Sequence, residues 1–185
     1  MIRQATLADA KAIAALTVAA MPSLAMQFCA SNRMEDAIRL LERFIALEGN
    51  QYSYGNALVY ISDGEVAGSI SGYDGAQIKQ LRQPFFTYLQ ENYHPHGFEM
   101  EYESEPGEYY LDTISVSPLH QGKGIGKSLI KAALQHAKAL GHQKAGLLVD
   151  EENPDAKRLY EKLGFEVADH KLLLGKMHHH LSYLL

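Results

Sequence analysis

The spacing of apolar residues along the chain predicts that helices and strands alternate. Five stretches repeat apolar residues every three or four positions, which indicates amphipathic helices. They are residues 7–20, 23–50, 78–89, 128–140 and 154–163. Short apolar runs indicate strands. They lie at residues 2–5, 57–62, 65–73, 109–117 and 144–150, with two more after Phe165, through Val167 and through residues 172–174.

Turn and cap signals support this division. Thr6 with Asp9 three residues later is typical of a helix start. The Asp63-Gly64 pair between two apolar runs predicts a hairpin. Residues 144–150 are almost all apolar, which predicts a central strand. A chain of 185 residues favours one domain over residues 1–185.

Residues 74–108 fit the alternating pattern least well. A helix is predicted over 78–89, broken or kinked at Pro84. A glutamate-rich stretch follows, which we interpret as a solvated loop within an insertion between the third and fourth strands. No His/Asp spacing there indicates a metal site, so we expect no metal.

Composition excludes several classes of protein. The net charge is −5, and no cluster of Lys and Arg suggests a nucleic-acid surface. No apolar run approaches the ~20 residues that cross a membrane, so we expect no membrane partner. The first residues lack the pattern of a signal peptide. With Cys29 as the one cysteine, this favours a reducing, cytoplasmic location.

A glycine-rich loop between an apolar run and a helix is the strongest chemical signal. Glycines there and the free N–H groups of a helix N-terminus form an anion site, most often for phosphate. A P-loop would need a glycine where Gln121 stands, and a dinucleotide fingerprint would need one at Lys127. The pattern Gln/Arg-x-x-Gly-x-Gly/Ala matches instead. The anion-contacting candidates are Gln121, Gly122, Lys123, Gly124, Gly126, Lys127 and Ser128.

This loop resembles the pyrophosphate loop of the GNAT superfamily, the acyl-CoA-dependent N-acyltransferases. Two neighbouring segments add to the resemblance. The lead-in at residues 114–118 has the family's apolar-x-Val-x-Pro form, and residues 153–165 resemble its second motif, which contains an Asn and a Tyr and closes in Leu-Gly-Phe. The resemblance covers the C-terminal half of the core, while the first hundred residues match only in general layout.

The resemblance implies a fold, a donor and a set of residues. The fold is α/β (α+β), with a mixed, mostly antiparallel sheet of six to seven strands flanked by helices, and splayed between strands 4 and 5. The donor is acetyl-CoA. Its pantetheine arm would pair with the backbone at Ile114 and Val116 and with the side chain of Asn153. Tyr160 would protonate the thiolate leaving group. For Asn153 and Tyr160 the alternatives are a helix cap and a buried aromatic.

The base that deprotonates the acceptor amine has two candidates. Asp112 lies on the same face as Ile114 and Val116 if the strand alternates regularly, and burial beside apolar groups would raise its pKa. It can equally be a hydrogen-bonded strand residue. Glu108 matches positions where some relatives place a glutamate.

Three functions are compatible with these motifs. The first is transfer of an acetyl or acyl group to a primary amine of a small molecule or peptide, by direct attack in a ternary complex. The second is a non-catalytic acyl-CoA sensor, and the third, disfavoured by Gln121, is a P-loop hydrolase. Residues 178–180 are three consecutive histidines that alternate in direction on a strand, so they cannot all bind one metal. The apolar tail at residues 181–185 is a candidate for pairing across a homodimer interface.

Overall fold

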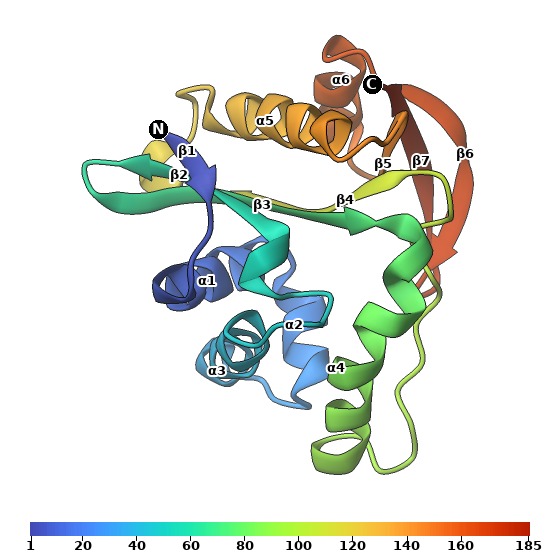
Figure 1. Cartoon of the computed structure of the whole chain (residues 1–185). Helices are drawn as coiled ribbons and strands as arrows, with labels where there is room; N and C mark the ends of the chain where they lie inside the picture. The colour runs from blue at the N-terminus through green and yellow to red at the C-terminus, as the bar shows by residue number, and fades with distance from the viewer.

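A seven-stranded sheet separates two layers of helices in the computed structural model, which describes residues 1–185 (Figure 1). The strand order is β1-β2-β3-β4-β5-β7-β6, and only β4 and β5 pair in parallel. This confirms the predicted fold class. The strands are β1 (Ile2–Gln4), β2 (Ala57–Ser62), β3 (Glu65–Asp74), β4 (Tyr109–Val116), β5 (Lys144–Asp150), β6 (Glu166–Leu173) and β7 (Lys176–Leu184).

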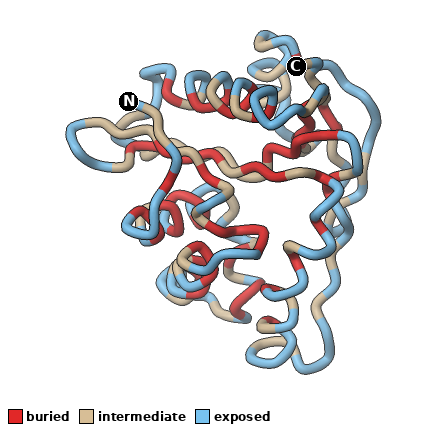
Figure 2. The backbone as a smooth tube through the Cα atoms, in the orientation of Figure 1, coloured by how far each residue is buried: buried red, intermediate tan, exposed pale blue.

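Each face of the sheet has its own helices and its own core. One face carries α1 (Ala10–Ala20), α2 (Pro22–Phe28), α3 (Met34–Ile45) and α4 (Ile78–Asn92), and the other carries α5 (Ile125–Ala139) and α6 (Pro154–Lys162). Buried backbone follows the sheet and the inward sides of the helices (Figure 2). The rings of Phe28, Phe44 and Phe85 fill the first core. Leu129, Leu147 and Phe165 lie in the second.

Strands β4 and β5 are joined at one end only. Their register covers two pairs, Tyr109 with Ala145 and Tyr110 with Gly146. Beyond these pairs the strands separate, while β4 stays paired with β3 as far as Val116. The predicted splay between strands 4 and 5 is therefore present, and it leaves backbone groups of both strands without a strand partner.

Strand β7 occupies a position that the sequence did not reveal. It pairs along all seven residues of β5 on one side and with β6 on the other. Val167 and Leu172 both lie on β6, so the prediction of separate strands there is wrong. The tail predicted to pair across a homodimer pairs with β5 of its own chain, where Leu181 is fully buried. This contradicts the structural basis of the dimer hypothesis.

The segment predicted as an insertion is docked on the protein. α4 continues through Pro84 as one helix. In the acidic stretch that follows, Glu103 is buried, and Glu105 pairs with lysines on β5 and β6 at 3.3 and 3.1 Å. Glu101 accepts a hydrogen bond of 2.9 Å from the backbone N–H of Leu174. The prediction of a solvated loop is therefore wrong for Glu103, whereas Glu101 is exposed and Glu105 is half-buried.

No single helix is long and apolar enough to cross a membrane, although residues 7–20 and Pro22–Phe28, bent by 113° where they meet, would together have the length and composition.

Candidate active site

A cavity of about 280 Å³ lies where β4 and β5 separate. Its walls also include residues of α2, α6, β7 and the docked acidic segment. Four of the predicted site residues line it: Asp112 and Ile114 from β4, Asn153 at the start of α6, and Tyr160 within α6. The structure therefore brings together residues as far apart in the sequence as Asp112 and Tyr160, which are separated by 48 positions.

A β-bulge in β4 places Asp112 on the face opposite to the predicted one. Ile70 pairs with Ile114 and Gly72 with Leu111, so Ser71 alone faces Asp112 and Thr113. Leu111 and Ile114 consequently both contact the core under α5, whereas the Asp112 side chain lies on the side of α1 and α4. The prediction that Asp112, Ile114 and Val116 share a face is wrong. Regular alternation cannot anticipate one additional residue.

Asp112 ends a chain of hydrogen bonds. The Gln51 side-chain amide donates to Asp112 Oδ2 at 3.1 Å and to Glu103 Oε1 at 3.0 Å. Arg82 pairs with Glu103 and donates to the Gln51 side-chain oxygen at 3.3 Å. Burial, together with the nearby charge of Glu103, raises the pKa of Asp112 to about 7 against the opposing effects of Gln51 and Arg82. A carboxyl group with this pKa can exchange a proton near neutral pH.

Sequence reasoning missed Gln51, Arg82 and Glu103, which are each at most 3% exposed. A signal for Arg82 was present. It lies at helical spacing between Ile78 and Phe85, on the apolar side of the predicted helix. A charged residue in that position requires a buried partner. Gln51 and Glu103 lie in irregular segments, where no periodicity marks them.

Tyr160 and Asn153 occupy the opposite wall of the cavity. The Tyr160 ring packs edge-on against Phe165, with 5.7 Å between ring centroids. Burial raises the pKa of the Tyr160 phenol to about 12, so the phenol keeps its proton at neutral pH. Asn153 caps α6 by accepting a hydrogen bond of 3.1 Å from the Ala156 N–H. This cap uses only the side-chain oxygen of Asn153, so the side-chain NH₂ group remains available as a hydrogen-bond donor.

The glycine-rich loop follows the open end of β4 and leads into α5. Gly122 and Gly124 adopt φ values of +75° and +77°, which favour glycine. Gly124 is the N-cap of α5, a helix of 15 residues whose first N–H groups are free of helical partners. Open space surrounds the Cα atoms of both glycines. The loop can therefore receive an anion close to its backbone.

The remaining loop candidates differ in role. The Gln121 side chain donates to the Val116 carbonyl at 3.2 Å, which ties the loop to the end of β4. Ser128 donates to the Gly124 carbonyl at 3.1 Å, and Lys123 Nζ to the Leu119 carbonyl at 3.2 Å. Lys127 is exposed. Gly126 lies beside Val116, since a Cβ added to it would be 3.7 Å from the valine side chain.

The backbone of Ile114 and Val116 faces the gap between β4 and β5. The N–H groups of Thr113 and Ser117 donate toward β3, to Ser71 Oγ at 3.2 Å and to the Ala67 carbonyl at 2.9 Å. Because successive N–H groups of a strand point to opposite edges, those of Ile114 and Val116 point away from β3. Both amides are therefore directed at the opened edge.

Glu108 lies apart from the other candidates. It is not part of the cavity wall. Its fully buried carboxylate accepts from His180 Nε2 at 2.9 Å and from the Glu105 N–H at 3.2 Å. It lies at the closed end of the β4–β5 gap, where its side chain occupies the space beside Gly146. The structure therefore does not place Glu108 with Asp112 and Tyr160.

Comparison with known proteins identifies the class. The sequence profile of the acetyltransferase (GNAT) family matches residues 20–165, so the chain belongs to this family. A mycothiol acetyltransferase from Streptosporangium roseum is 51% identical over 59 residues, which are 32% of this chain and 17% of that protein. The chain thus spans less than a fifth of the length of this relative. The family predicted from the loop and the 153–165 motif is confirmed.

Two solved structures match the whole fold. A crystal structure of an acetyltransferase is 34% identical with a TM-score of 0.85, over 100% of this chain and 98% of that one. An N-acetyltransferase from Staphylococcus aureus Mu50 is 25% identical, also with a TM-score of 0.85, over 99% of this chain and 100% of that one. These matches include the first hundred residues, where the sequence alone gave only a general layout.

Proposed function

We propose that the protein is an acetyl-CoA-dependent N-acetyltransferase that acts on a primary amine of a small molecule or peptide. The observation that carries this proposal is the gap between β4 and β5. It connects an anion-binding loop at one end with a cavity that holds a carboxyl group and a phenol at the other. A GNAT family acetyltransferase from Brucella melitensis, which shares the fold with a TM-score of 0.55 at 21% identity, was crystallised in complex with acetyl-CoA.

The donor would lie along the gap. Its pyrophosphate would accept hydrogen bonds from the backbone of the loop at residues 122–128, next to the positive end of α5. Its pantetheine amides would pair with the backbone of Ile114 and Val116 at the opened edge, as a peptide strand would. The NH₂ group of Asn153 would donate to a pantetheine carbonyl. The thioester would then lie in the cavity beside Tyr160.

Transfer would proceed by direct attack in the ternary complex. The neutral amine attacks the thioester carbonyl carbon, and an amide N–H of the opened β4 edge stabilises the oxyanion. The amine loses its proton to Asp112, directly or through a water molecule. As the carbon–sulfur bond breaks, Tyr160 protonates the departing thiolate. Asp112 is preferred over Glu108 because it lines the cavity, while Glu108 is occupied by His180.

The chemistry of the cavity supports a cationic amine as the acceptor. Asp112 contributes a carboxyl group that forms no ion pair, whereas Arg82 pairs with Glu103 and Lys176 with Asp150. Tyr52 and Tyr110 contribute aromatic surface. Carboxylates near an opening attract ammonium groups, and Asp112 can then take up the proton. The similarity to the Streptosporangium roseum mycothiol acetyltransferase covers 17% of that protein and therefore does not define the acceptor.

A thiol-release assay with acetyl-CoA over a panel of primary amines tests the proposal. We expect release that depends on both substrates. Isothermal titration with acetyl-CoA and with ATP serves as the control for binding. Acetyl-CoA binding without thiol release for any amine would favour the sensor alternative, and ATP binding without acetyl-CoA binding would refute the donor assignment. The cytoplasmic location and the oligomeric state remain predictions, testable by cell fractionation and by sedimentation.

A further inference from the structure

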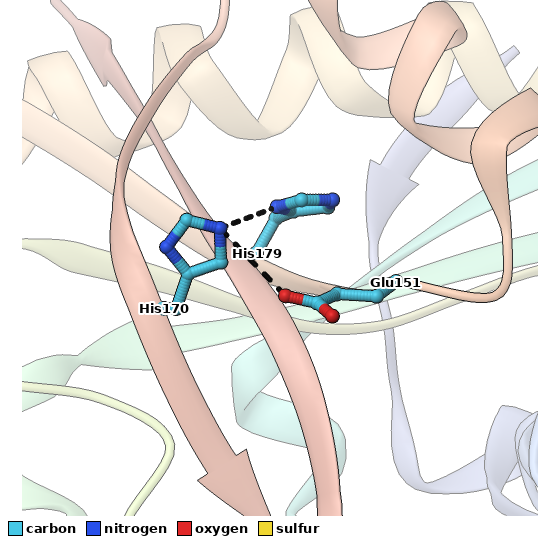
Figure 3. Close-up of side chains that lie close together, drawn as sticks. All are labelled: Glu151, His170 and His179. Carbon is cyan, nitrogen blue, oxygen red and sulfur yellow. Dashed lines mark hydrogen bonds and ion pairs between the residues drawn. The ribbon is translucent and has the colours of Figure 1, made fainter.

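We propose that Glu151, His170 and His179 form a binding site for a divalent transition-metal ion such as Zn²⁺. The three side chains converge outside the proposed active site, from the loop after β5 and from the neighbouring strands β6 and β7 (Figure 3). His170 and His179 are direct partners in the register of these two strands, so both side chains leave the sheet on the same face.

The distances fit one metal ion. His170 Nε2 lies 3.1 Å from His179 Nδ1 and 3.7 Å from Glu151 Oε1. The three donor atoms all lie within 4.8 Å of one another. Two ligands on a tetrahedral Zn²⁺, with bonds of about 2.0–2.1 Å, are separated by about 3.3 Å. Side-chain rotations would bring the three donor atoms to these separations.

The backbone around the cluster holds the ligands in place before a metal binds. Both histidines belong to hydrogen-bonded strands, and β7 is paired on both sides. The N–H of Glu151 donates to the Met177 carbonyl at 3.2 Å, which fixes the start of the β5–α6 loop against β7. Metal binding would therefore order the side chains but little of the backbone.

Local charge favours a cation at this position. Residues 150–152 are three consecutive carboxylates. Lys176 forms ion pairs with two of them, at 3.5 Å from Asp150 and 3.1 Å from Glu152. Glu151 has only His170 as an ionic partner, which leaves its charge for a metal. Two imidazoles and one carboxylate are ligands that suit Zn²⁺ rather than Mg²⁺ or Ca²⁺, which prefer oxygen.

A second group of acidic and histidine side chains does not qualify. Glu105, Glu108 and His180 also lie close together. His180 is 1% exposed, and both of its ring nitrogens are hydrogen-bonded to carboxylates, of Glu108 and Asp169. Glu105 is paired with two lysines. In the Glu151 cluster, by contrast, Glu151 and His170 are exposed to solvent, so an ion can reach it.

Isothermal titration of the untagged protein with Zn²⁺ tests the proposal. We expect one Zn²⁺ per chain, and we expect Mg²⁺ to give no binding signal. His179→Ala and Glu151→Gln should each lower the affinity at least tenfold, since even partners outside the ligand set change metal affinity by about 10–100-fold. Crystals soaked in Zn²⁺ should show anomalous density between the three side chains.

His178→Ala is the matched control. It removes the adjacent histidine of the same strand, whose side chain points to the opposite face and lines the proposed active site. This variant should bind Zn²⁺ like the wild type. Absence of binding to the wild type would overturn the proposal, and so would His179→Ala retaining full affinity. The test measures metal binding and not thiol release from acetyl-CoA. Its outcome is therefore independent of the proposed function.

Discussion

The raised pKa of Asp112 predicts opposite effects of Asp112→Asn on activity and on stability. The pKa of about 7 lies well above the ordinary value of 3.8. Between these two values the folded protein binds more protons than the unfolded chain, so the free energy of unfolding falls as the pH rises. The full cost, present above about pH 7, is on the order of 4 kcal/mol. Between about pH 5 and pH 8 the change is about 2 to 3 kcal/mol.

Asparagine has the same shape as aspartate and can still accept from Gln51, but it does not ionise. We therefore expect Asp112→Asn to be more stable than the wild type at about pH 8, with the gap narrowing by about 2 to 3 kcal/mol at about pH 5. Urea denaturation at the two pH values measures this difference. In the thiol-release assay, the wild-type kcat/KM should rise with pH through about 7. The variant should lose that rise and about 10²–10⁴-fold of the rate.

Either half of this prediction can fail independently. An unchanged pH–rate profile in Asp112→Asn would remove Asp112 as the base. A variant that is less stable than the wild type at about pH 8 would refute the assignment of a raised pKa, because the substitution would then have removed a favourable interaction. Asp63→Asn makes the same aspartate-to-asparagine change at the tip of the β2–β3 hairpin and serves as the control. It should leave the pH–rate profile unchanged.

Three further substitutions test other parts of the site. Tyr160→Phe should lower kcat about 10- to 100-fold while the melting temperature stays nearly constant, because the ring still packs on Phe165. Arg82→Leu should cost about 3–5 kcal/mol in urea denaturation, because it leaves Glu103 buried without its partner. Gly124→Ala should weaken acetyl-CoA binding in isothermal titration, because a side chain at φ +77° strains the loop that we propose binds the pyrophosphate.

Each of these variants has a control of the same type elsewhere in the chain. Tyr102→Phe removes the hydroxyl of an exposed tyrosine and should leave kcat unchanged. Arg39→Ala breaks a surface pair with Asp36, worth about 0–1 kcal/mol. Gly49→Ala introduces the same strain at φ +75°, far along the chain from the loop, and should leave acetyl-CoA binding intact. If a control behaves like its test variant, the effect is not specific to the site.

Local patterns predicted those parts of the structure that depend on local interactions. The Asp63-Gly64 hairpin and the central strand at residues 144–150 both follow from a few neighbouring residues. The loop before α5 was recognisable because two of its glycines adopt positive φ values, which other residues rarely do. Tyr160 and Asn153 were found through a motif whose spacing reflects one helix.

The polar network was not predictable, because tertiary contacts create it. Gln51, Arg82 and Glu103 are separated by 20 residues or more, and they meet only when the acidic segment docks. The bulge at Asp112 depends on pairing with Ser71. His179 provides a similar example. Three consecutive histidines correctly predicted alternating directions, but the partner His170 became visible only with the register of β6 and β7.

The place of β7 in the sheet has a consequence for the order of folding during synthesis. β5 has two residue pairs with β4 and seven with β7, so β7 is its main partner. Because β7 comes last in the chain, β5 and α6, with Asn153 and Tyr160, leave the ribosome before it. At about 5–20 residues per second, this wait lasts about 2 to 7 s. During that interval β5 has no partner on its β7 side and two residue pairs on its β4 side. Until β7 is added, β5 is an edge strand that is open to pairing with another chain.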